Sequence, residues 1–268
     1  MKKVFKILIF TDLDGTLLDR DTFKFDIIRD YLKRLLSEGI HIIPNTSKTE
    51  KEILEFNNEL GSSLPYIAEN GAVIKGLDLL DSYLPNELIL SKEKDYLTKI
   101  FEKSVPDNLQ NKCKWLSLMD KKNQSFIFGL KDEKLKMALD RKYTIPFVFE
   151  GNKKEKKELS KIVKKKGLAL QEGGRVINLT DKVNKAKALQ VFVRFFKKKN
   201  QNVKTIAVGD NYNDLDMLKI SDFPCLVFND KFTLDQIPIN DLITTNKPSP
   251  KGWADVIKMA LVKISKNY

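Results

Sequence analysis

The chain alternates short apolar runs with segments whose apolar residues recur at helical spacing. Residues 4–11 and 40–45 have the pattern of strands buried on both faces, and residues from about 26–37 and 48–60 have that of amphipathic helices. A further apolar stretch follows at 65–74. Strands that alternate with helices predict a parallel sheet with right-handed crossovers. The N-terminal part of the chain therefore predicts an α/β fold.

The same alternation returns in the C-terminal part of the chain. The predicted elements are a helix at 185–199, a strand at 203–208, a helix at 213–220, strands at 224–228 and 242–245, and a final helix from about 252. Two α/β stretches of this kind predict one Rossmann-like core of three layers around a parallel sheet. We assign residues 1–83 and 184–268 to this core.

The intervening residues 84–183 follow a different pattern. The apolar runs 125–129 and 147–150 predict antiparallel strands, and residues 168–171 with 175–179 predict a hairpin. Helices are expected near 91–103, 131–141 and 153–166. This stretch therefore predicts an α+β domain inserted into the α/β core.

Two carboxylates follow directly after the first predicted strand. Asp12 and Asp14 stand where an open α/β sheet presents its functional groups, at the carboxyl end of a strand. Residues two apart in an extended chain share a face, so the two acids should repel each other unless a cation lies between them. Oxygen ligands suit Mg²⁺. This pattern predicts that one carboxylate attacks a substrate while the other handles protons.

Histidine and cysteine usage excludes several kinds of hydrolase. His41 is the only histidine and lies within a predicted strand, where a structural role is expected. Ser-His-Asp hydrolases, histidine-based phosphatases and most zinc hydrolases are therefore excluded. Cys113 and Cys225 lie in different predicted domains without metal-ligand spacing, so both are expected in the core. Carboxylates must carry the chemistry.

The formal net charge of +12 raises the question of nucleic-acid binding. The lysine runs, such as 153–157 and 164–166, are spread along the chain with glutamates mixed in, and few aromatic residues interleave with them to stack bases. We therefore interpret them as solvated helix faces, expect no nucleic-acid partner, and expect a positive field that attracts small anionic substrates. No apolar run reaches the roughly 18 residues of a membrane helix. A cytoplasmic protein without a membrane partner is expected, and the sequence does not indicate an oligomeric state.

Four short motifs together resemble those of the haloacid dehalogenase-like phosphatases. Asp12-Leu13-Asp14-Gly15-Thr16 matches D-x-D-G-T, and Asn45-Thr46-Ser47 follows the second strand. Lys185 opens a helix, and Gly209–Asp214 matches G-D-x-x-N-D. The motifs occur in this order and span most of the chain. The resemblance implies that the insert is a type IIB cap, which closes over the active site and selects the substrate.

The resemblance also implies roles for the acids and for a metal. Asp12 is expected to form an aspartyl-phosphate, and Asp14 to protonate the leaving oxygen and then activate water. The expected cofactor is Mg²⁺, in a metal site formed by Asp12, the backbone carbonyl of Asp14, Asp210 and Asp214. Asp214 is also expected to orient Lys185 or water around the ion.

Three further residues are expected to bind the phosphoryl group or its surroundings. Lys185 is expected to offset its charge, and Asn213 to hold ligand or water. Thr46 is the expected hydroxyl that binds a phosphoryl oxygen. Ser47 is the alternative, because Ser47 and Glu50 have the spacing of a capping box.

A narrower resemblance concerns the mannosyl-3-phosphoglycerate phosphatases. It rests on residues 45–49, 69–72, 173–175 and 251–253. A substrate with a phosphate, a carboxylate and a sugar needs cationic partners, and Lys48 and Arg175 are suited to this role. The expected substrate-binding residues are Ser47, Lys48, Glu69, Asn70, Gly71, Arg141, Gly174, Arg175 and Asn213.

One departure leaves the sugar open. Where this family has R-x-x-S-E-P in the cap, residues 141–146 have Ile145 in place of the glutamate, so mannosyl and glucosyl substrates are equally admissible. A broad sugar-phosphate phosphatase of the Cof type and a relative of sucrose-phosphate phosphatase are alternatives. A catalytically inactive binding module is a further alternative, and the presence of Asp12, Asp14, Lys185 and Asp210 together argues against it.

Overall fold

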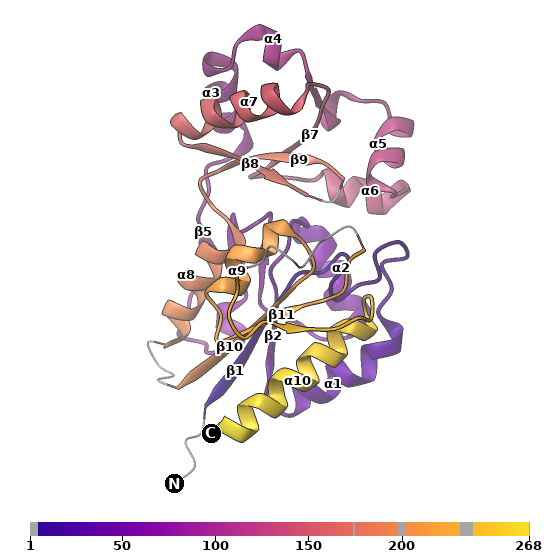
Figure 1. Ribbon diagram of the computed structural model, residues 1–268, viewed down its shortest axis with the longest axis vertical. Coiled ribbons are helices and arrows are strands. Elements are labelled where there is room, and N and C mark those ends of the chain that lie inside the picture. Colours follow the sequence, from indigo (N-terminus) through magenta and orange to yellow (C-terminus); the bar gives the residue numbers. More distant parts are fainter. Residues whose placement is uncertain (1–4, 174, 198–201, 231–237, 268) are drawn as a thin grey trace.

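The computed structural model describes residues 5–173, 175–197, 202–230 and 238–267. The chain forms two lobes, a core built around a parallel sheet and a cap that lies over one end of it (Figure 1). The strand order of the core sheet is β12-β11-β10-β1-β2, and all neighbouring strands in it are parallel. Its strands are β1 (Lys6–Thr11), β2 (His41–Pro44), β10 (Val203–Gly209), β11 (Phe223–Leu226) and β12 (Ile243–Thr244). The predicted α/β core is confirmed.

Helices cover both faces of this sheet, and apolar side chains alternate between them. Ile9 packs into one buried cluster, whereas Leu8 and Phe10 pack into the other. The first cluster lies under α1 (Arg29–Ser37), α2 (Glu50–Leu60) and α10 (Lys251–Asn267), and the second under α8 (Lys185–Lys197) and α9 (Leu215–Lys219). Burial on both faces explains why the strand sequences are almost continuously apolar.

An antiparallel sheet lies beside the core sheet. It consists of β3 (Tyr66–Ala68), β4 (Val73–Lys75) and β5 (Glu87–Ile89), in that order. β5 falls inside the stretch assigned to the cap, yet it pairs with β4, so the chain leaves the core only after β5. Short 3-10 helices occur in both lobes: η1 (Asp26–Ile28), η2 (Leu77–Leu79), η3 (Leu116–Leu118) and η4 (Tyr212–Asp214).

The cap is an α+β unit with an antiparallel sheet of its own, in the order β6-β7-β9-β8. Helices α3 and α7 cover the outer face of this sheet, and α5 and α6 lie toward one end of it (Figure 1). The elements are α3 (Lys94–Ser104), α4 (Asp107–Gln110), β6 (Cys113–Trp115), α5 (Lys121–Phe128), α6 (Asp132–Leu139), β7 (Ile145–Phe149), α7 (Lys153–Lys165), β8 (Leu168–Glu172) and β9 (Ile177–Asp181).

The strand predicted at 125–129 is wrong, because these residues belong to helix α5 and its end. Asp120 caps this helix by accepting a hydrogen bond from the backbone N–H of Asn123 at 2.8 Å. Gly129 ends it in the left-handed conformation, with φ of 67°. Phe128 is buried while Phe126 is 87% exposed, so the apolar run reflects a one-sided helix. The fourth strand of the cap sheet is instead β6, which the sequence reading missed.

Further predictions concerned the cap hairpin, the two cysteines, Gly174 and membrane-spanning helices. The hairpin of β8 and β9 is confirmed, and Cys113 and Cys225 are free and buried, as expected for core residues. Gly174, predicted to bind substrate, lies outside the described residues. Within the described parts of the chain, the helices all lack the length or the apolar character needed to span a bilayer.

Candidate active site

Asp12 lies directly beyond the end of β1 and is fixed from several sides. Its backbone N–H donates to Val208 O at 2.9 Å, and its carbonyl accepts a hydrogen bond from Thr11 Oγ1 at 2.7 Å. Thr11 Oγ1 in turn accepts one from the indole N–H of Trp253, on α10, at 2.9 Å. The carboxylate Oδ1 accepts from the backbone N–H of Leu13 at 2.8 Å. These contacts orient Asp12 at the carboxyl edge of the sheet.

Asp12, Asp210 and Asp214 form a buried acidic cluster, in which one carboxylate oxygen of each lies within 4.8 Å of the others. Burial, together with the charges of Asp214 and Asp12, raises the pKa of Asp210 to about 7. Burial also raises the pKa of Asp214, although Lys185 opposes the shift. Three acids in one buried site are unfavourable without added positive charge, and oxygen donors are the ligands of hard divalent cations. The cluster fits such an ion.

Lys185, the first residue of α8, supplies one positive charge to this cluster. Its ammonium lies 2.9 Å from Asp12 Oδ1 and 2.7 Å from Asp214 Oδ1, and its side chain is 1% exposed. Burial alone would lower the pKa of Lys185, but Asp12 and Asp214 raise it overall. Asp214 Oδ2 accepts hydrogen bonds from the backbone N–H groups of Asp210 and Asn211. The lysine is therefore charged and held rigidly.

Asp210 is held by residues that the sequence reading did not single out. Thr16 Oγ1 donates to Oδ1 at 2.8 Å, while Arg20 Nη2 at 2.6 Å and Asn229 Nδ2 at 3.0 Å donate to Oδ2. Gly15 has φ of +78°, and a Cβ there would lie 3.0 Å from Asp210 Oδ2. Asn229 follows β11, so its position near a strand end was an available signal, whereas no local pattern marks Arg20.

Asp14 lies apart from this cluster. Because β1 ends at Thr11, the pleat from which a shared face was predicted does not continue to Asp14, and Asp14 is not one of the three acids of the cluster. That the two carboxylates share a cation stays a prediction. Asp14 Oδ1 lies 3.0 Å from Lys48 Nζ, and its side chain is 40% exposed. Burial of Oδ1 raises the pKa of Asp14, which Lys48 partly offsets. A raised pKa suits a residue that carries a proton.

The residues that cap the start of α2 differ from those predicted from the sequence. The capping box is formed by Thr49 and Glu52, each side chain bonding the other's backbone N–H, so the box predicted for Ser47 and Glu50 is wrong. Ser47 is therefore not engaged as the helix cap, and it lines the cavity described below. Thr46 is 1% exposed, and its Oγ1 accepts from the backbone N–H of Lys48 at 3.4 Å. The choice between the two hydroxyls stays a prediction.

A cavity of about 370 Å³ opens over these groups, between the core and the cap. Asp12, Asp14 and Asp210 line its core side, and Arg175, Val176 and Asn178 line its cap side. Arg20, Lys48, Arg141 and Asn213 also contribute to its wall. The structure thus brings acidic groups and several cations of both lobes to one enclosed space, which suits a small anionic ligand.

Phe23, from a core loop, lies between two of these cations. Its ring centroid is 5.1 Å from Lys48 Nζ and 5.5 Å from Arg175 Cζ, and the ring also packs against the cap cluster that contains Leu130. The guanidinium of Arg175 donates to the carbonyl of Phe128 in the cap. Burial would lower the pKa of Lys48, but Asp14 and Glu52 raise it overall. Both cations are therefore charged and oriented by the protein.

Arg141 and Glu69 have structural partners at the junction of cap and core. Arg141 Nη1 donates to Ser47 O at 3.1 Å and to Thr144 Oγ1 at 2.9 Å. Glu69 accepts from the backbone N–H groups of Lys142 and Tyr143 and from Thr144 Oγ1. These bonds tie the cap loop between α6 and β7 to the core, which is a different role from the substrate binding predicted for Glu69.

Asn70 and Gly71 belong to the same junction. The turn 69–71 has positive φ throughout, and a Cβ on Gly71 would lie 2.3 Å from the carbonyl oxygen of Asn184. None of these three residues is among the described residues that line the cavity, so their predicted contact with substrate is not supported.

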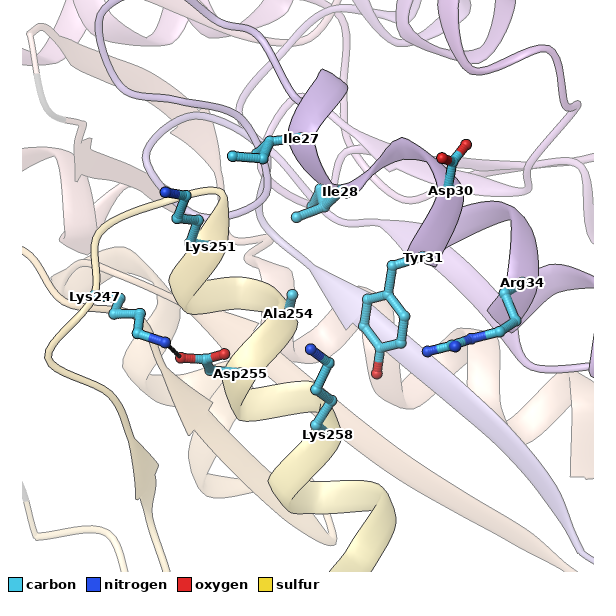
Figure 2. A pocket seen from close by; sticks show the side chains of 10 residues that line it. All are labelled: Ile27, Ile28, Asp30, Tyr31, Arg34, Lys247, Lys251, Ala254, Asp255 and Lys258. Atoms are coloured by element: carbon cyan, nitrogen blue, oxygen red, sulfur yellow. Dashed lines mark ion pairs between the residues drawn. The ribbon is translucent and has the colours of Figure 1, made fainter.

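A second cavity, of about 440 Å³, lies between α1 and α10 (Figure 2). Two of its charged side chains pair with each other, since Lys247 lies 2.7 Å from Asp255, and Arg34 and Lys258 both lie over the ring of Tyr31. Asp12 and Asp210 of the acidic cluster line the smaller cavity. We therefore take the cavity between core and cap as the candidate active site.

Several known proteins are similar to this chain. The chain is 30% identical over 269 residues to a glucosyl-3-phosphoglycerate/mannosyl-3-phosphoglycerate phosphatase of Persephonella marina, covering 97% of this chain and 99% of the relative. A protein of the same description from Methanococcoides burtonii is 30% identical, covering 94% and 96%. The fold resembles that of a Synechocystis sucrose-phosphatase, with a TM-score of 0.63 at 13% identity, over 96% of this chain and 98% of that chain.

The family assignment rests on the whole length of the core and cap. The model of the haloacid dehalogenase-like hydrolases matches residues 9–257, which include every motif discussed above. The chain therefore belongs to the haloacid dehalogenase-like hydrolases.

Proposed function

We propose that this chain is a Mg²⁺-dependent phosphatase that hydrolyses a mannosyl- or glucosyl-3-phosphoglycerate to the glycosylglycerate and phosphate. The observation that carries the proposal is the contact of Lys185 with Asp12, next to Asp210, beneath a cavity lined by cations. The names of the relatives from Persephonella marina and Methanococcoides burtonii support the substrate.

Asp12 and Asp210 would hold Mg²⁺, together with the backbone carbonyl of Asp14 implied by the family motif. Asp214 lies within the same cluster and orients Lys185. When bound, the ion offsets the charge of the phosphate, which carries about −1.5 to −2, and of the attacking carboxylate. Arg20 and Lys185 add fixed positive charge from the protein on either side of the cluster.

Asp12 acts as the nucleophile. Its Oδ1 is held by Leu13 and Lys185, so Oδ2 attacks phosphorus, and the bond between phosphorus and the glycerate oxygen breaks. Asp14 gives its proton to the departing oxygen, consistent with its raised pKa. In the second half, water attacks phosphorus while Asp14 takes its proton, and the bond to Asp12 breaks to release phosphate.

Arg175 and Lys48 are assigned to the anionic groups of the substrate. Arg175 reaches the cavity from the cap and Lys48 from the core, so a ligand with two anionic groups would be contacted from both lobes. A guanidinium grips a carboxylate through two parallel hydrogen bonds. A simple hexose phosphate has only one of these anionic groups.

A substrate panel tests the proposal. Phosphate release is measured for mannosyl- and glucosyl-3-phosphoglycerate, sucrose 6-phosphate, glucose 6-phosphate and p-nitrophenyl phosphate, with Mg²⁺ and with EDTA. We expect Mg²⁺-dependent turnover, with the highest kcat/KM on a glycosyl-3-phosphoglycerate. Preference for a sugar phosphate without the glycerate would favour the broader phosphatase, and Mg²⁺-independent or absent turnover of every ester would contradict the proposal.

A further inference from the structure

Strand β9 presents two different faces. Leu179 packs into the cap's buried cluster together with the partly buried Ile177, whereas Val176 and Asn178 line the cavity above Asp12. Alternate residues of a strand point to opposite sides of a sheet, which explains why Asn178 faces the core while Leu179 faces the cap interior. Asn178 is 2% exposed. A polar side chain is therefore buried on the inner face of the cap.

The amide oxygen of Asn178 has no hydrogen-bond partner among the described residues. The reason lies in its cross-strand neighbours, Pro146 on β7 and Gln171 on β8. Proline has no backbone N–H to offer, and Gln171 Nε2 donates to Val183 O. A buried acceptor without a donor is unfavourable for folding, so its retention at a cavity wall points to a ligand that supplies the donor.

We propose that Asn178 is a specificity-determining residue whose Oδ1 accepts a hydrogen bond from a hydroxyl of the substrate's sugar. The inference rests on the proposed function and adds the position of the sugar. Arg175 and Lys48 suit the anionic groups, whereas a neutral amide oxygen repels anions and accepts from a hydroxyl. Val176, Phe128 and Leu130 line the same cavity and offer apolar surface to the C–H face of a sugar ring.

The test compares Asn178→Leu with the wild-type protein on a glycosyl-3-phosphoglycerate and on p-nitrophenyl phosphate, which has no sugar. Leucine is close to asparagine in size but cannot accept the hydrogen bond. We expect kcat/KM on the sugar ester to fall by about 5- to 15-fold, and kcat/KM on p-nitrophenyl phosphate to change less than about twofold. The thermal midpoint should stay equal or rise, because the substitution removes an unsatisfied buried group.

Thr180→Val is the matched control, since Thr180 lies on the same strand and face, is buried and donates to Asp181 O. It should leave the ratio of the two kcat/KM values unchanged. Equal losses on both esters in Asn178→Leu, or no loss on either, would overturn the inference. If the wild-type protein prefers a different sugar phosphate, the proposed function fails. The role of Asn178 is then decided by comparing Asn178→Leu with the wild-type protein on that ester and on p-nitrophenyl phosphate.

Discussion

The ammonium of Lys185 lies 2.9 Å from Oδ1 of Asp12. Lys185 opens α8, whereas Asp12 directly follows the first strand, so the contact joins two segments that are distant in sequence. Because Oδ1 also accepts from the N–H of Leu13, one oxygen of Asp12 is anchored and the other is left for a reacting group. The lysine thus orients the carboxylate and offsets its charge at the same time.

Replacement of Lys185 by Met should abolish turnover and destabilise the protein. The side chain is paired with Asp12 and Asp214 in a buried site, and removal of one partner of a buried ion pair costs about 3–5 kcal/mol. Urea unfolding of the metal-free protein measures this loss. The double variant Lys185→Met/Asp214→Asn should recover part of the stability but none of the activity. A double variant as unstable as the single one would show that the two charges do not depend on each other.

Asp12→Asn should reduce turnover by about 10³- to 10⁶-fold, because an amide cannot form the acyl-phosphate. Its shape is almost that of aspartate, so the far-ultraviolet circular dichroism should stay that of the wild-type protein. Phosphate release with saturating Mg²⁺ is the measurement. Asp216→Asn, at an exposed acid of α9, is the control and should keep full activity. Turnover by Asp12→Asn near the wild-type rate would remove Asp12 as the nucleophile.

Arg20→Met should tighten Mg²⁺ binding to the metal-free protein. Arg20 donates to Asp210 at 2.6 Å, so its positive charge competes with a cation for that carboxylate. Because the Arg20 side chain is 33% exposed, the gain should be small, about two- to fivefold. Isothermal titration calorimetry gives the affinities, with Arg29→Met as the control because its partner is the exposed Asp26. Weaker binding by Arg20→Met would mean that Arg20 shapes the site instead of competing for it.

Strand positions explain why part of the site could be predicted from the sequence. Parallel strands end at one edge of the sheet, so the strand-end position of Asp12 and the family motif that contains Asp210 together predicted that both acids lie in one site. The strand-end rule does not determine the direction of the Asp14 side chain, because β1 ends at Thr11 and the period of two does not continue past the strand. It also offered nothing for Arg20, whose contact with Asp210 depends on how a loop folds back.

The cap shows a second limit of local patterns. The apolar run at 125–129 has the composition of a strand, yet it forms the end of helix α5. Asp120 caps the start of this helix with its side chain, and Gly129 ends it. The residue that caps α2 was equally ambiguous in the sequence, because both Ser47 and Thr49 precede an acid by three positions. Contacts of the rest of the molecule decide between such alternatives, as when Thr49 Oγ1 donates to the carbonyl of Met137 in the cap.

The single histidine should give the protein a measurable dependence on pH. Burial and the nearby charge of Lys6 lower the pKa of His41 from its usual 6.5. The folded state thus disfavours the charged imidazole, so stability that is present above about pH 6.5 is lost as the pH falls through the folded pKa. The free energy of unfolding should fall more between pH 7.5 and 5.5 in the wild-type protein than in His41→Gln. Equal changes in both proteins would show that His41 titrates alike in the folded and unfolded states.

Arg175→Ala should separate substrates by their second anionic group. The guanidinium is already oriented by the carbonyl of Phe128 and the ring of Phe23, so little ordering is left for binding. If it binds the glycerate carboxylate, kcat/KM on a glycosyl-3-phosphoglycerate should fall by roughly 10- to 150-fold, taking about 1.5–3 kcal/mol for a charge-assisted contact. Turnover of glucose 6-phosphate should barely change, because that ester has no carboxylate. Lys136→Ala, at an exposed cap position, controls for general loss of positive charge. Equal losses on both esters would mean that Arg175 binds the phosphate or stabilises the structure of the cap. The glycerate carboxylate would then need another partner in the cavity.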